Sequence, residues 1–475
     1  MTGDIMSDNK KTFFEENITR RKVLKIAGTA ALMGVTGPFS SAKLFAHEKK
    51  PNILFILTDD HRYDAFSCMG HPVVKTPNLD RIANEGANFK NTFVTTALCS
   101  PSRASFLTGQ YAHTHGVVTN HTMWNDNNVT FMELIKKAGY DTAFIGKWHM
   151  PGDKLPKLRG VDEFITFTKE GGQGVYYDCP LVINGVETPR PGKYITNDLT
   201  DFALKFIGKK RANPFCLYLA HKAVHFGFRP PEHMKTLYSG QDLHMPPESD
   251  TWVTLTNNSI FVGAPIPMNN LYRNYLRVVT SVDEQVGRVL ATLERMGELD
   301  NTVLIYAGDN GHLFGEHGLY DKRNAYEESI RIPFFIRYPK LIRQTGKRDQ
   351  MILNIDLAPT LLDIIGAQIP SSMQGKSIVP YLKSPILEGR DAFLYEHFPV
   401  FPIPIPGITA VRTEDFKYIT YQKGTWQDQL FNLKADPREL KNIIKTDAGK
   451  AALPGLQARL GELKKETGYR FFTHG

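Results

Sequence analysis

Residues 95–109 of this 475-residue chain combine a cysteine, several hydroxyl side chains and an arginine. Cys99 stands directly before a Ser-Pro pair, and Arg103 follows it by four residues. Because Pro101 suits the first turn of a helix, we expect a helix that begins at Ser102 and places Cys99 near its N-terminus. The helix dipole and Arg103 would then favour a negatively charged group beside the thiol. A buried structural cysteine in a loop is the simpler alternative.

Acidic residues follow two apolar runs elsewhere in the chain. One run, which predicts a buried strand, ends before Asp59 and Asp60, and another ends before Asp309 and Asn310. Open α/β sheets place their sites at the carboxyl ends of strands. Carboxylates and an amide that converge there need a cation, and oxygen ligands favour Ca²⁺ or Mg²⁺ over Zn²⁺. Taken alone, the first pair also fits a polar loop, and Asp309-Asn310-Gly311 also fits a tight turn.

Basic side chains recur in comparable places. Lys147 and His149 follow the strand predicted over residues 140–145, and His225 comes shortly after another predicted strand end. Lys322 follows the second acidic pair by about a dozen residues. Side chains just past strand ends can reach a shared pocket, although their spacing alone does not assign them a role.

Together these segments resemble the type I sulfatases of the alkaline-phosphatase-like superfamily. The resemblance rests on Cys99-Ser-Pro-Ser-Arg103 with Leu107-Thr108-Gly109, on both acidic pairs and on the string Gly-Lys-Trp-His that ends at His149. It extends from about Pro51 to the end of the chain. A large, mostly parallel sheet is the fold that this family implies.

The resemblance implies a cofactor set. A maturation enzyme would oxidise Cys99 to formylglycine (3-oxoalanine). The ligands of a bound Ca²⁺, with Mg²⁺ as the alternative, would be Asp59, Asp60, Asp309 and Asn310, with the modified Cys99 beside them.

The resemblance also implies a mechanism for hydrolysing sulfate monoesters. One hydroxyl of the hydrated formylglycine attacks sulfur, while Arg103, Lys147 and Lys322 stabilise the negative charge. His225, helped by Lys322, protonates the leaving alcohol, and His149 is the base for the release of sulfate.

Local strings point to a substrate. Residues 97–99, 113–120 and 403–413 resemble the corresponding segments of N-acetylglucosamine-6-sulfatases. This resemblance implies that the substrate carries a 6-O-sulfate on N-acetylglucosamine or is a related sulfated glycan, and that the enzyme acts in glycosaminoglycan degradation. The alternatives are an arylsulfatase, another glycan O-sulfatase, or a phosphomonoester or phosphonate hydrolase of the same superfamily. A non-catalytic polyanion-binding protein would need a damaged motif, and the motifs are intact. Further candidates for substrate contact, equally open to a structural role, are His113, His115, Trp124, Arg229 and His397.

The order of elements predicts an α/β fold. Strands and helices alternate from residue 51 to 365, which is typical of a large, mostly parallel sheet flanked by helices. Short strands from residue 391 onward predict a small antiparallel sheet, closed by a helix at about 451–467. Residues 228–270 read as one long loop. The predicted divisions are an export signal (1–46), a sulfatase catalytic domain (47–385) and a C-terminal subdomain (386–475).

The N-terminal segment predicts export. Arg20 and Arg21 precede an apolar run rich in alanine and glycine, which resembles a twin-arginine signal; a general secretory signal or a basic amphipathic helix is the alternative. The run is too short for a membrane span, so we expect a periplasmic or extracellular enzyme without a stable membrane anchor. The net charge of +8 comes without basic blocks interleaved with aromatics, so nucleic acid is not indicated as a partner.

Overall fold

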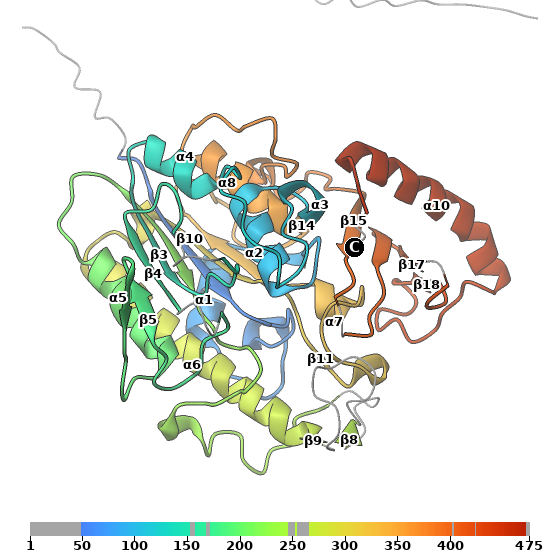
Figure 1. Cartoon of the computed structure of the whole chain (residues 1–475), viewed down its shortest axis with the longest axis horizontal. Helices are drawn as coiled ribbons and strands as arrows, with labels where there is room; N and C mark the ends of the chain where they lie inside the picture. The colour runs from blue at the N-terminus through green and yellow to red at the C-terminus, as the bar shows by residue number, and fades with distance from the viewer. Residues whose placement is uncertain are drawn as a thin grey trace, which may run out of the picture. The chain divides into compact units, whose positions relative to one another are not determined.

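A ten-stranded mixed sheet is the central element of the computed structural model (Figure 1). The structure describes residues 49–152, 157–167, 172–245, 252–253, 266–400, 403–422 and 424–471, so the export signal predicted for residues 1–46 lies outside it. The strands of this sheet are β1 (Asn52–Thr58), β2 (Ala87–Phe93), β3 (Asp141–Gly146), β4 (Glu163–Phe167), β5 (Leu181–Ile183), β6 (Val186–Thr188), β7 (Phe215–Ala220), β10 (Thr302–Gly308), β13 (Phe334–Arg337) and β14 (Gly346–Leu353). Their order across the sheet is β14-β2-β13-β10-β1-β7-β3-β4-β5-β6.

The middle of the sheet is parallel, as predicted. Strands β10, β1, β7, β3 and β4 all pair in parallel, and β1 is in register with β10 from Asn52–Thr302 to Thr58–Gly308. Every residue of β1 is buried, which explains why its sequence is continuously apolar from Ile53 to Leu57. The carboxyl ends of these strands therefore meet at one edge of the sheet.

Helices cover both faces of the sheet (Figure 1). Alternate residues of β1 face opposite sides, because Phe55 and Leu57 belong to one buried cluster and Leu54 and Ile56 to the other. The first cluster includes α2 (Cys99–Thr108), α4 (Phe131–Lys137) and α8 (Leu357–Ile364). The second includes α1 (Pro77–Glu85), α5 (Ile195–Ile207) and α6 (Met268–Arg295).

The C-terminal part forms the predicted four-stranded antiparallel sheet. Its strands, in spatial order, are β15 (Ala392–His397), β16 (Ile408–Thr413), β17 (Phe416–Tyr421) and β18 (Gln429–Asn432). Helix α10 (Asp447–Thr467) packs on it and begins four residues before the predicted start, because the Thr446 side chain accepts a hydrogen bond from Gly449 N. Strand β15 contacts the approach to α2, since Glu396 N donates to Thr95 O at 2.9 Å.

The start of α2 differs from the prediction. The helix begins at Cys99 rather than Ser102, because Leu98 is extended and its carbonyl accepts from Ser102 N at 2.9 Å. Pro101 fits inside the first turn, where its missing N–H costs no hydrogen bond. Cys99 is therefore the first residue of the helix instead of a residue in the preceding loop.

The predicted long loop over residues 228–270 is also revised. It contains the strand pair β8 (Trp252–Val253) and β9 (Ile266–Pro267) and the start of α6; residues 246–251 and 254–265 lie outside the described ranges. No helix among the described residues is long and apolar enough to cross a membrane. The remaining short elements are α3 (Ala112–His115), α7 (Glu327–Ile330), α9 (Val379–Lys383), β11 (Leu313–Phe314) and β12 (Tyr320–Asp321).

Candidate active site

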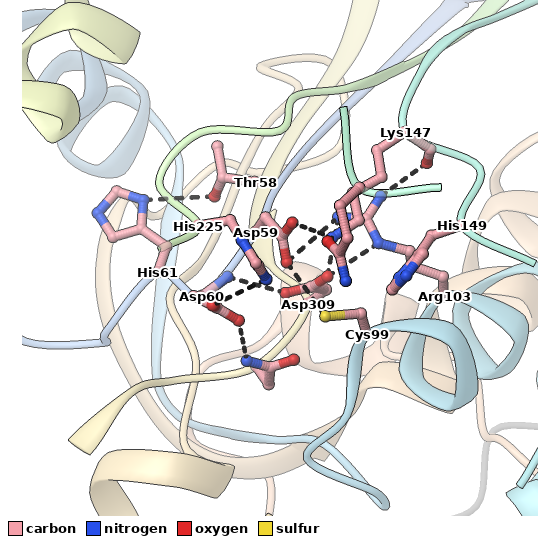
Figure 2. Close-up of polar contacts among 12 residues, drawn as sticks. Thr58, Asp59, Asp60, His61, Cys99, Arg103, Lys147, His149, His225 and Asp309 are labelled. Atoms are coloured by element: carbon pink, nitrogen blue, oxygen red, sulfur yellow. Dashed lines mark hydrogen bonds and ion pairs between the residues drawn. The ribbon is translucent and has the colours of Figure 1, made fainter. Parts of the chain in front are cut away.

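Four neighbouring strand ends bring the predicted site residues together. Strands β10, β1, β7 and β3 lie side by side, and each is followed by polar side chains that point into one cluster (Figure 2). Cys99 and Arg103 enter this cluster from the first turns of α2. The residues supplied by the strand ends are Asp309 and Asn310 after β10, Asp59 and Asp60 after β1, His225 after β7, and Lys147 and His149 after β3.

Three carboxylates form the centre of the cluster. Asp59, Asp60 and Asp309 are completely buried, and one oxygen of each lies within 4.8 Å of the others. A hydrogen bond links two of these residues, because the backbone nitrogen of Asp60 donates to Asp309 Oδ1 at 3.0 Å. Asp60 Oδ2 and the carbonyl oxygen of the Asn310 side chain are buried without a hydrogen-bond partner. Oxygen atoms left in this state fit a hard divalent cation such as Ca²⁺ or Mg²⁺.

Burial and mutual repulsion divide the charge unequally among these acids. Burial, reinforced by Asp59, raises the pKa of Asp309 to about 7. Burial also raises the pKa of Asp60. Burial alone would raise the pKa of Asp59, but Lys147 and the other nearby cations hold it well below its usual range. Of the three carboxyl groups, Asp59 is therefore the one that ionises most readily.

Cys99 lies against this charge. Its side chain is completely buried, and Sγ lies 3.4 Å from Asp59 Oδ1. Burial, followed by the charge of Asp59, raises the pKa of the Cys99 thiol to about 12. Because the thiolate is the nucleophilic form of cysteine, an unmodified Cys99 is a poor nucleophile near neutral pH.

Arg103 joins α2 to two strand ends. Its Nε donates to Asp309 Oδ2 at 2.9 Å, and Nη1 donates to the backbone oxygen of Lys147 at 2.8 Å. The side chain is among the largest that are fully buried. The guanidinium thus links the helix that carries Cys99 to the segments after β10 and β3.

Two lysines and two histidines complete the ring around the carboxylates. Lys147 forms a buried ion pair with Asp59, and Lys322 forms one with Asp60. His225 Nε2 lies 3.8 Å from Asp60 Oδ2 and keeps part of its side chain exposed. Burial, followed by Lys147, holds the pKa of His149 well below its usual range, so its imidazole is neutral.

Three polar residues near this centre are absent from the sequence predictions. Gln173 accepts a hydrogen bond from Lys147 Nζ at 2.6 Å, within a glycine-rich stretch that carries no motif. The ammonium of Lys222 lies 5.2 Å from the centroid of the Tyr176 ring. His312 Nδ1 lies 3.8 Å from Asp60 Oδ2. His312 and Lys222 had a signal in the sequence, because His312 comes two residues after the Asp309-Asn310 pair and Lys222 lies between β7 and His225.

Several of the further substrate candidates have structural contacts instead. His113 bonds to Glu396 Oε2 at 2.7 Å and to Thr467 O at 2.9 Å. His115 bonds to Ser105 Oγ at 3.1 Å. The Trp124 ring packs edge-on against Trp148, with the ring centroids 5.3 Å apart.

Comparison with known protein families gives two matches. The model of the family described as Sulfatase matches residues 51–367, which is more than half of the chain. A second model, described as N-sulphoglucosamine sulphohydrolase, C-terminal, matches residues 315–466.

Individual relatives cover most of the chain. An N-acetylglucosamine-6-O-sulfatase of Bacteroides thetaiotaomicron is 34% identical over 88% of this chain and 86% of its own length. The human N-acetylglucosamine-6-sulfatase is 30% identical over 87% of this chain and 84% of its own length. The solved structure of BT4656 in complex with its substrate D-glucosamine-2-N,6-O-disulfate superimposes with a TM-score of 0.80 at 32% identity, over 88% of this chain and 98% of that one.

Proposed function

Because the chain belongs to the sulfatase family and is a sulfuric ester hydrolase, we propose that it removes the 6-O-sulfate from N-acetylglucosamine or a related sulfated glucosamine. The observation that carries the proposal is the position of Cys99, whose sulfur faces a buried triad of carboxylates inside a ring of cations. The names and the substrate of the relatives above support the choice of sugar.

The charge of the site matches a sulfate ester. Each of three cations pairs with a different carboxylate of the cluster: Lys147 with Asp59, Lys322 with Asp60, and Arg103 with Asp309. A sulfate group that enters this ring meets fixed positive charges, which stabilise the negative charge that develops as the ester bond breaks. The buried surroundings strengthen this stabilisation because little water competes with it.

A divalent cation and a modified Cys99 complete the proposed site. Asp59, Asp60, Asp309 and Asn310 would hold Ca²⁺, or Mg²⁺ in its place, because their oxygens are close together and two of them lack partners. The cation would neutralise the carboxylates and polarise the nucleophile. Oxidation of Cys99 to formylglycine would supply a hydroxyl nucleophile in place of a thiol that stays protonated.

Two histidines carry the proton transfers in this proposal. Burial holds the pKa of His225 well below its usual range, so this residue must first gain the proton that it gives to the leaving alcohol; Lys322, which contacts the other oxygen of Asp60, assists it. His149, which is neutral, accepts the proton that is lost when sulfate is released. The proposal includes export under the direction of residues 1–46, a sulfated glycan as substrate, and a cysteine-oxidising enzyme as maturation partner.

Sulfate release from N-acetylglucosamine-6-sulfate tests the proposal. We expect turnover in the presence of Ca²⁺ once mass spectrometry has confirmed formylglycine in the peptide 91–103, and no turnover on N-acetylgalactosamine-4-sulfate. Turnover of an aryl sulfate alone would replace the glycan with an aryl substrate. Faster turnover of an aryl phosphate would replace sulfate with phosphate.

The Cys99→Ala variant provides the test of the nucleophile. We expect it to lose sulfate release by at least about 10⁴-fold and to keep the fold, because alanine fits the space of the buried thiol. The matched control is Cys216→Ala, which removes another fully buried thiol that lies in β7 outside the cluster. Near-normal rates in Cys99→Ala would overturn the mechanism.

A further inference from the structure

One hydroxyl of the C-terminal sheet bridges two segments of the candidate site. Tyr395 lies in β15 and is completely buried. Its hydroxyl donates to the backbone oxygen of Arg323 at 2.5 Å and accepts from Ala97 N at 3.4 Å. Arg323 directly follows Lys322, and Ala97 precedes Cys99 by two residues. A single atom of the C-terminal sheet therefore spans the segments that carry Lys322 and Cys99.

The backbone around Lys322 needs such a restraint. Both of its neighbours have left-handed backbone conformations, with φ of 82° at Asp321 and 84° at Arg323. Arginine rarely adopts this conformation, which is commoner for glycine, asparagine and aspartate, and at Arg323 it persists only where surrounding contacts hold it. The Arg323 side chain pairs with Asp321, and the Arg323 carbonyl is held by Tyr395. The hydroxyl of Tyr395 thus restrains the strained turn through the backbone oxygen of its last residue, Arg323.

The Cys99 side of the bridge is held independently of Tyr395. Thr95 N donates to Asn354 Oδ1 at 3.2 Å, and Thr95 O accepts from Glu396 N at 2.9 Å. Asn354 Nδ2 also donates to Ser102 Oγ at 3.1 Å in the first turn of α2. The approach to Cys99 therefore keeps its place if the Tyr395 hydroxyl is removed, and the effect of that removal falls on the Lys322 turn.

We propose that Tyr395 is a positioning residue that sets the distance between Lys322 and residue 99 for protonation of the leaving group. This inference rests on the proposed function, in which Lys322 assists His225. Proton transfer depends steeply on geometry, so a small shift of the Lys322 ammonium weakens its assistance to the protonation of the leaving alcohol. Tyr395 touches neither substrate nor reacting atoms and acts only through the turn that carries Lys322.

Two substrates that differ in their leaving groups test this role. A sugar alcohol needs a proton to leave, whereas the 4-nitrophenolate of 4-nitrophenyl sulfate leaves as an anion. We expect Tyr395→Phe to lower kcat on N-acetylglucosamine-6-sulfate by roughly 10- to 100-fold with little change in KM. On 4-nitrophenyl sulfate we expect a change of less than about threefold.

The matched control removes a hydroxyl elsewhere in the same sheet. Tyr418 in β17 donates to Asp428 Oδ2 at 2.7 Å and touches neither site segment. We expect Tyr418→Phe to leave the ratio of the two activities unchanged. A Tyr395→Phe variant that unfolds, or that loses both activities equally, gives the hydroxyl a general structural role and overturns the inference.

A double-mutant cycle provides a second, independent reading. If Tyr395 acts through Lys322, adding Tyr395→Phe to Lys322→Met lowers kcat on the sugar sulfate no further. Losses that multiply in the double variant overturn the inference. Turnover of N-acetylglucosamine-6-sulfate by the wild type decides the proposed function. The rates of the variants relative to the wild type decide the role of Tyr395, so failure of one proposal can be told from failure of the other.

Discussion

Asn310 contributes an uncharged oxygen to a cluster whose other oxygens belong to carboxylates. Its amide nitrogen donates to Asp60 Oδ1 at 2.7 Å, which leaves the side-chain oxygen buried and without a partner. The same side chain therefore orients one proposed ligand and supplies another. Asn310 carries no charge, yet both polar atoms of its side chain contribute to the proposed cation site.

Replacing this side chain tests the cation site directly. We expect Asn310→Ala to weaken Ca²⁺ binding by about 10- to 100-fold, because one ligand and the hydrogen bond to Asp60 are lost together. Isothermal titration of the metal-free protein with Ca²⁺ measures the change. The matched control is Asn88→Ala in β2, which removes another buried asparagine with an unpartnered oxygen away from the cluster. An unchanged affinity in Asn310→Ala would exclude this residue as a ligand.

The short helix α7 supports the loop that carries Asp309 and Asn310. Gly311 N donates to Ser329 O at 2.9 Å, and a Cβ at Gly311 would lie 2.0 Å from the backbone oxygen of Glu328. Only glycine lets the loop approach the helix this closely. Packing between these two elements therefore determines where the end of β10 places its polar side chains.

A methyl group at this contact should disturb both the fold and the site. We expect Gly311→Ala to lower the free energy of unfolding by about 1–3 kcal/mol and to weaken Ca²⁺ binding, because the loop must move away from α7. The same substitution at Gly455 in α10 meets no atom within 4 Å and should raise that free energy by about 0.5–1 kcal/mol. Urea unfolding of both variants provides the comparison, and equal stabilities would refute the packing argument.

Contacts between distant parts of the chain hold the C-terminal elements in place. His113 in α3 bonds to Glu396 in β15 and to the last residue of α10, Thr467. Burial alone would lower the pKa of His113, but the hydrogen bond and charge of Glu396 raise it above its usual value. The folded protein thus favours the charged imidazole, although that group is buried.

This linkage predicts how stability depends on pH. A histidine whose pKa is raised by folding stabilises the protein fully below its unfolded pKa of about 6.5 and loses that contribution as pH rises through the folded value. We therefore expect His113→Gln to be destabilised more at pH 5.5 than at pH 8.5, relative to the wild type. Chemical unfolding at both pH values measures the difference. A gap that widens with rising pH would contradict the assignment.

Much of the architecture could be predicted from the sequence because its central strands are buried on both faces. The apolar runs of β1 and β10 identified the strands, and the acids directly after them identified the carboxyl edge. Strands β2 and β14 gave no comparable signal, since both carry polar residues such as Asn88 and Lys347. A strand is detected from its sequence where its residues form a continuous apolar run or alternate regularly between apolar and polar, and neither pattern is clear in β2 or β14.

The site was predictable only in part, for a similar reason. Cys99, Arg103 and the acidic pairs belong to local strings, which a linear sequence displays directly. Gln173 contacts the cluster, and Tyr395 contacts the segments that carry Lys322 and Cys99, through the tertiary fold and from segments that carry no recognisable string. The contacts of Gln173 and Tyr395 depend on how distant loops and strands pack together, and no local pattern in the sequence predicts that packing.

The pairing of β1 with β10 has a consequence for the order of events during synthesis. Thr58 has no partner on that side until Gly308 has been made, about 250 residues later. Until then the segment that contains Cys99 lacks the neighbours that enclose it, whereas in the finished fold its side chain has no exposed surface. If the proposed oxidation of Cys99 takes place, the enzyme responsible would have to act before the sheet is completed, and the rate of folding would compete with the rate of maturation.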